Sequence, residues 1–91
     1  MSDKSLAEVL SERENREKKA KHVCREIKSE FGKSPEEKLF FAIVERAIYD
    51  ACVDGYYGAR SYLSGYIPHA EMCGVDSDWI RRVIKKVGLE C

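Results

Sequence analysis

The chain lacks several features that would place it in a familiar class of protein. Its 91 residues carry 16 lysines and arginines against 16 aspartates and glutamates, so its formal net charge is zero. A neutral chain has no overall attraction for nucleic acid, because phosphate neutralisation by lysine and arginine supplies most non-specific affinity for DNA. DNA binding would therefore need a local patch of positive charge.

Long hydrophobic segments are also missing. The first apolar cluster, residues 6–10, is short and is interrupted by Glu8. No stretch approaches the roughly 20 apolar residues of a membrane-spanning helix, and no secretory signal is visible. We therefore expect a cytoplasmic protein without a membrane partner.

The cysteines form no CxxC pair and are scattered over the chain: Cys24, Cys52, Cys73 and Cys91. In a cytoplasmic protein we expect them to be reduced, with Cys52 and Cys73 acting as small core residues. One metal constellation can be assembled, from His22, Cys24, His69 and Cys73. His22 and Cys24 would diverge on a helix, so they could not chelate one ion together, and we expect no metal site.

Signatures of catalysis and of cofactor binding are absent from the sequence. The segment GYYGARS (residues 55–61) lacks the lysine and the preceding strand of a phosphate-binding glycine loop. Nothing resembles an activating loop or an oxyanion site beside a cysteine and a histidine. We expect no cofactor and no catalytic residues, and we do not expect an enzyme.

The pattern of apolar residues predicts an all-α fold, and no internal repeat or Ser/Gly linker divides the chain. Residues 1–33 are predicted as a long charged helix, opened by a capping box at Ser5 and closed at Gly32. Apolar residues in its second half recur every four positions and line one face: Val23, Ile27 and Phe31. The first half is then either a solvated helix or an arm for a partner, with basic contacts available from Arg16, Lys18, Lys19 and Lys21.

Residues 34–91 are predicted as a small helical core domain. Ser34 and Pro35 are a strong helix start, because serine caps the first turn and proline needs no hydrogen-bond partner there. The helix that follows, to about Val53, is the most apolar in the chain and should be the central buried helix. A short helix around Tyr62 should follow the break at Asp54 and Gly55.

The segment 66–87, of which residues 66–86 read YIPHAEMCGVDSDWIRRVIKK, has the spacing of a helix-turn-helix. A small residue, Ala70, allows two helices to cross closely, and Gly74 suits the backbone that ends the first helix. Asp76 or Ser77 can cap the second helix, while Val75, Ile80 and Val83 should enter the core. The same spacing also occurs in helical hairpins and in protein-interaction domains, so it does not by itself establish a helix-turn-helix.

In DNA-binding proteins of this kind, the second helix enters the major groove. Here its outward face carries several cations, and a run from Arg81 to Lys86 contains no acid. DNA contacts are expected from Ser77, Asp78, Arg81, Arg82 and Lys85.

The run ARSYLSGYIPHAEMCGVDSDWIRRVIKK (residues 59–86), together with FFAIVERAIYDA (residues 40–51) before it, resembles small, uncharacterised proteins encoded by phages and prophages. Those proteins share an Ala-Arg-x-aromatic-Leu segment, a Cys-x-x-Gly-like turn and an Asp-x-aromatic-hydrophobic-Arg-Arg helix. The resemblance covers residues 37–87 and leaves the charged N-terminal helix unmatched. It implies a phage or mobile-element origin in a bacterial host and a helix-turn-helix-like C-terminal region, and it implies no enzymatic residues.

Two functions follow as hypotheses. The first is a small phage-type protein that binds double-stranded DNA through a helix-turn-helix, as a regulator of transcription or of another DNA transaction, and that forms a homodimer. The second is a protein-interaction module that binds and modulates a host enzyme or polymerase without DNA. The Ala-Gly-Ile-Val spacing and the basic run favour the first, whereas zero net charge and the acids Asp76 and Asp78 favour the second.

Overall fold

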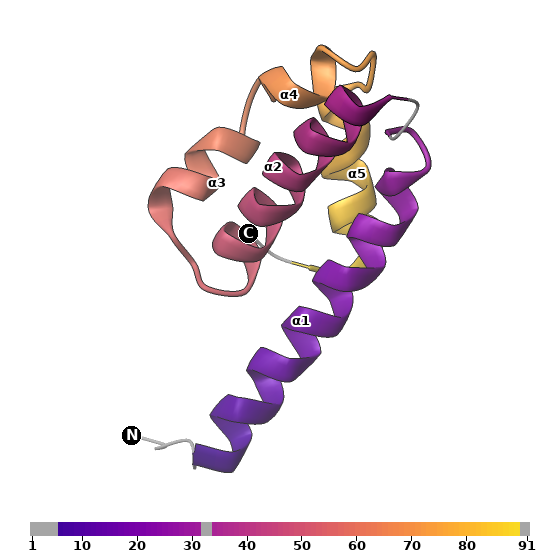
Figure 1. The fold of residues 1–91 in the computed structure, drawn as a ribbon. Helices are drawn as coiled ribbons and strands as arrows, with labels where there is room; N and C mark the ends of the chain where they lie inside the picture. The colour runs from indigo at the N-terminus through magenta and orange to yellow at the C-terminus, as the bar shows by residue number, and fades with distance from the viewer. Residues whose placement is uncertain (1–5, 32–33, 90–91) are drawn as a thin grey trace.

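The computed structural model describes residues 6–31 and 34–89, with side chains from residue 11 onward. This part of the chain contains no strand, and the predicted all-α fold is confirmed. Its five helices follow one another in the order shown in Figure 1: α1 Leu6–Lys28, α2 Pro35–Cys52, α3 Tyr57–Leu63, α4 Pro68–Glu71 and α5 Ser77–Val87.

Helix α1 is partly docked and partly free. Its second half packs on α2 and α5, and Ala20, Val23 and Ile27 are fully buried there. Its first half extends away from the other helices (Figure 1), and residues 11–15 are all exposed. An ion pair of 2.7 Å between Arg13 Nη2 and Asp54 Oδ1 ties this half back to the domain. The predicted ends at Ser5 and Gly32 lie outside the described residues.

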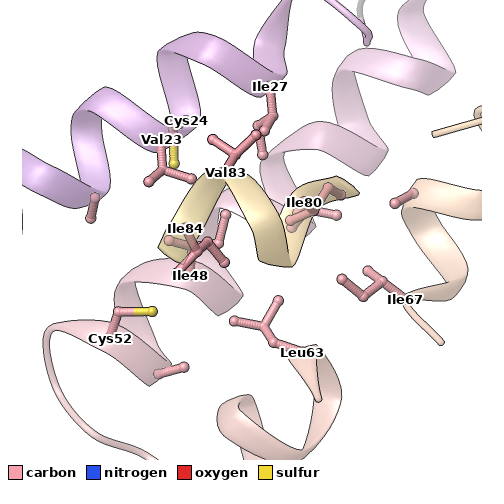
Figure 2. Packing of buried hydrophobic residues seen from close by; sticks show 14 of the residues in the cluster. Val23, Cys24, Ile27, Ile48, Cys52, Leu63, Ile67, Ile80, Val83 and Ile84 are labelled. Carbon is pink, nitrogen blue, oxygen red and sulfur yellow. The ribbon is translucent and has the colours of Figure 1, made fainter. Parts of the chain in front are cut away.

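Helix α2 begins as predicted and occupies the centre of the fold. Ser34 Oγ accepts a hydrogen bond of 3.2 Å from the backbone N–H of Glu37, and Pro35 is the first helical residue. Helix α2 packs against α1, α3 and α4, which explains its high apolar content. Figure 2 shows Ile48 of α2 and Ile84 of α5 within one cluster of buried hydrophobic side chains.

In the turn between α4 and α5, Gly74 and Asp76 have the backbone and capping roles predicted for them. Gly74 has a φ of +76°, in the left-handed region that favours glycine, and Ala70 is fully buried. Asp76 is the cap of α5, with its Oδ1 accepting from the N–H of Asp78 at 3.2 Å. However, α4 is only one turn long, so a helix-turn-helix in the strict sense stays a prediction.

Replacing Gly74 by alanine should lower the free energy of unfolding by about 1 kcal/mol, because a Cβ is disfavoured in left-handed backbone. The penalty should be purely conformational, since an added Cβ would meet no atom within 4 Å. Gly58→Ala is a matched control, because Gly58 lies in α3 without a positive φ and also faces open space. The control should be slightly stabilised. Urea denaturation of both variants would test this, and equal effects would refute the assigned backbone strain.

The cysteines differ in part from expectation. Cys52 is buried as predicted but is disulfide-bonded, so the expectation of a reduced thiol is wrong at this position. Spacing along a chain does not show which cysteines approach within bonding distance in the fold. Cys24 and Cys73 are free, and burial raises the pKa of the Cys24 thiol to about 12, which keeps it protonated at neutral pH. Cys91 lies outside the described residues.

Candidate nucleic-acid interface

Helix α5 has an anchored face and a cationic face. Ile80, Val83 and Ile84 are buried, and Figure 2 shows them directed into the cluster that includes Ile27 and Ile67. The opposite side carries three exposed cations, which we call the α5 cations: Arg82, Lys85 and Lys86. Because the buried face fixes the helix, the backbone that carries these three side chains is held in one orientation.

Arg81 has a different environment from the α5 cations. Its Nη1 donates to the backbone carbonyl of Leu63 at 3.1 Å and to that of Gly65, and its Nη2 pairs with Asp78. Carbonyls at the end of a helix have no partner within the helix. A guanidinium placed there donates hydrogen bonds to them, and its positive charge interacts favourably with the negative end of the helix dipole. Arg81 thus joins α5 to the end of α3, and it would have to give up these bonds to contact DNA.

Ser77 is buried in a small polar network at the start of α5. Its Oγ accepts from the backbone N–H of Ile67 at 2.9 Å and donates to Glu71 Oε2 at 2.6 Å. Its own N–H also donates to Glu71 Oε2, at 2.9 Å. The side-chain and backbone hydrogen bonds from Ser77 lower the pKa of Glu71. Since Ser77 is only 4% exposed, it is not available to DNA and we remove it from the candidate site.

The start of α5 carries negative charge at the surface. Asp76 and Asp78 are both exposed. Asp78 pairs with Arg81, and Asp76 Oδ2 lies 3.7 Å from Arg82 Nη2. Carboxylates stabilise a helix N-terminus but repel phosphate. We therefore place the candidate interface on the second half of α5, with Arg82 and Lys85 retained from the predicted set and Lys86 added to it.

A second cationic surface lies on α1 and was only partly predicted. Of the four cations expected there, Arg16 and Lys19 are half-buried, and Lys19 Nζ donates to the carbonyl of Gly88 at 3.3 Å. From residue 18 onward, the exposed cations recur at spacings of three, four and three residues, which places them on one side of the helix. We call them the α1 stripe: Lys18, Lys21, Arg25 and Lys28. This spacing is visible in the sequence and would have identified the whole stripe.

The α1 stripe borders a groove between α1 and α2 with a volume of about 500 Å³. Phe31 and Phe41 line this groove, and their rings lie 5.4 Å apart. Lys28 and Lys38 also line it, together with one acid, Glu45. The positive charge at this end of the stripe is therefore partly offset, in contrast to the second half of α5.

Aromatic and histidine side chains form a separate cluster between α2, α3 and α4. The hydroxyl of Tyr62 lies 2.7 Å from His69 Nδ1, and the rings of Phe40 and His69 are 5.6 Å apart. Burial raises the pKa of Tyr62. Within the described residues, no three His, Cys, Asp or Glu side chains gather closely enough to hold a metal ion. Nor is any helix of this part of the chain both long and apolar enough to span a bilayer.

No protein-family model, curated protein or solved structure matches this chain. The resemblance to small phage proteins therefore stays a prediction.

Proposed function

We propose that this protein binds double-stranded DNA and contacts its phosphates through the α5 cations, Arg82, Lys85 and Lys86. The observation that carries the proposal is the exposure of all three on the free side of a helix whose other side is buried in the core. Such a surface holds positive charge in a fixed position, which suits a regular array of phosphates.

The proposal also explains how a neutral protein can attract DNA. The two acids at the start of α5, the cap Asp76 and Asp78 in the first turn, lie beside Arg82 and Arg81, whereas Lys85 and Lys86 lie in its last turn. Separation of the charges leaves a local positive field at one end of the helix. Phosphate contacts position a protein on DNA without reading its sequence, so a role in transcription would need further contacts with bases.

The direct test is a variant in which Arg82, Lys85 and Lys86 are all changed to alanine. We expect wild-type affinity for duplex DNA to fall steeply with salt, with a log–log slope of about −3 for three phosphate contacts. The variant should bind far more weakly and with a slope near zero. Its fold should be retained, because exposed charges contribute little to stability. Fluorescence anisotropy of a labelled mixed-sequence duplex at several salt concentrations would measure both properties.

The matched control removes the same number of charges from α1, by changing Lys18, Lys21 and Arg25 to alanine. Because both variants have the same net charge, a difference in their DNA affinity must come from the location of the lost charges and not from the total charge. Loss of binding in the α1 variant alone would move the interface to the α1 stripe and overturn the assignment to α5. Absence of wild-type binding even at low salt would overturn the DNA proposal itself.

A protein-interaction module is the second candidate, and a specific observation favours it. Several large apolar side chains are exposed, most strongly Tyr57 at 84%, Tyr66 at 70% and Met72 at 65%. Aromatic and methionine side chains are enriched at protein interfaces. If DNA is not bound, a host protein that covers these residues becomes the better proposal.

A further inference from the structure

The side of α2 that points away from the core carries two exposed aliphatic residues. Leu39 is 61% exposed and Ile43 is 37% exposed, although both lie on the central helix of the fold. Exposed positions of such a helix are normally polar, because only the opposite side is buried. We call this surface the outer face of α2 and define it by five residues: Glu36, Leu39, Ile43, Arg46 and Asp50.

These five residues form one continuous stripe. They are separated by three, four, three and four positions, so at 3.6 residues per turn they lie within an arc of about 80°. The buried residues of α2, including Val44 and Ile48, lie on the other side. Helices α1 and α3 flank α2 (Figure 1), and α4 also packs on it, but none of them covers Leu39.

The order of residues along the stripe is symmetrical about Phe41. Leu39 and Ile43 are two positions before and after it, whereas Glu36 and Arg46 are five positions before and after it. If two copies of this helix lie antiparallel with a two-fold axis at Phe41, Leu39 of one copy therefore faces Ile43 of the other. Glu36 then faces Arg46. A two-fold axis repeats each of these contacts, which yields two apolar pairs and two ion pairs.

We propose that the outer face of α2 is a homodimer interface, occupied by the same face of a second copy in antiparallel orientation. Charge complementarity favours a second copy as the partner and an antiparallel orientation of the two α2 helices. A parallel arrangement would place Glu36 against Glu36 and Arg46 against Arg46, and like charges at close range oppose association. The proposal does not rest on DNA binding.

The side chain of Arg46 is suited to this role. It is 82% exposed and contacts Asp50 of its own helix through Nε, at 3.3 Å. This contact uses one edge of the guanidinium, so the terminal nitrogens are left for Glu36 of the second copy. The exposed pair with Asp50 contributes little to stability on its own, and it orients the arginine along the stripe.

The interface should be weak. From Glu36 to Arg46 the stripe spans only about 15 Å of helix axis. Two such helices bury much less than the roughly 1,600 Å² of a standard protein–protein interface. We therefore expect a reversible dimer that forms as the protein concentration rises.

The test is sedimentation velocity over a concentration series from about 5 to about 500 µM, which measures the monomer–dimer distribution of the wild type, two single variants and one double variant. The wild type should shift from monomer towards dimer. Glu36→Arg and Arg46→Glu, each alone, should abolish the shift, because each places like charges opposite one another. The double variant Glu36→Arg/Arg46→Glu should recover it, because the pairs are restored with their signs exchanged.

If the double variant dimerises again, the single substitutions acted on the pairing between copies and not on the fold. Circular dichroism of each variant would check that the fold is retained. Tyr57→Glu is the control, since Tyr57 is more exposed than Leu39 but lies on α3, and it should leave the dimer intact. A wild type that is monomeric throughout the series would overturn the proposal. A dimer that survives both single variants, or one that the double variant fails to restore, would overturn it equally.

Discussion

Ile48→Ala should lower the free energy of unfolding by about 3 kcal/mol. Ile48 is fully buried on α2, the helix that packs against α1, α3 and α4. Its removal leaves a cavity in the buried cluster that it shares with side chains of the other helices (Figure 2), because these side chains are held by different helices and cannot all close in. Substitutions of this type cost about 2 to 5 kcal/mol in protein cores. That is a large fraction of the stability of a 91-residue chain.

Ile43→Ala provides the matched comparison for Ile48→Ala. It is the same substitution on the same helix, but Ile43 is 37% exposed. Its cost should stay below about 1 kcal/mol, because less apolar area is removed and no closed cavity forms. Urea denaturation at low protein concentration, where dimers do not contribute, would measure both. Similar costs at the two positions would mean that α2 is not oriented as described.

The secondary structure could be predicted largely from local signals. Ser34 and Pro35 start α2, Gly74 ends the segment after α4, and Gly88 closes α5 with a φ of +87°. Each of these signals acts through bonds within a few residues, so the sequence is sufficient to locate it. The docking of the second half of α1 was likewise visible from the spacing of Val23 and Ile27.

The candidate site was predicted less well, because its chemistry depends on contacts between distant residues. Arg81 was expected at the surface with Arg82, yet it reaches back to carbonyls at the end of α3, 16 and 18 residues earlier. Ser77 was expected to face DNA, yet it bonds to Ile67 and Glu71. A polar side chain at a helix start can face solvent or a neighbouring turn, and only the fold decides which.

The network around Ser77 leads to the second large effect, for Ser77→Ala. The substitution removes the acceptor of the Ile67 N–H, which is buried, and it also removes one of the donors to the Glu71 carboxylate. A buried donor that loses its partner costs about 1 to 3 kcal/mol, so we expect a loss of about 2 kcal/mol at neutral pH. Ser64→Ala is the control. The Ser64 hydroxyl is exposed and donates to the carbonyl of Ser61, so its loss should cost less than about 0.5 kcal/mol.

The effect of Ser77→Ala should also depend on pH. The folded-state pKa of Glu71 is lowered from its ordinary value of 4.5, chiefly by the hydrogen bond from the Ser77 side chain. A lowered pKa means that the ionised carboxylate stabilises the fold. This contribution to stability is complete above the ordinary pKa of Glu71 and is lost as the pH falls through its folded-state pKa. Because the variant keeps only the backbone donor of residue 77, its stability should fall less on acidification.

Thermal melts of the wild type and of Ser77→Ala at several values from about pH 7 to about pH 3 would therefore converge towards acid, with the widest gap above pH 5. Parallel curves would show that the hydroxyl acts only through the Ile67 N–H and that Glu71 is not coupled to it. Coincident curves would contradict the network as a whole. With coincident curves, Ser77 would not join α5 to α4, and the fixed orientation of Arg82 and Lys85 would depend on the apolar face of α5 and on the bonds of Arg81.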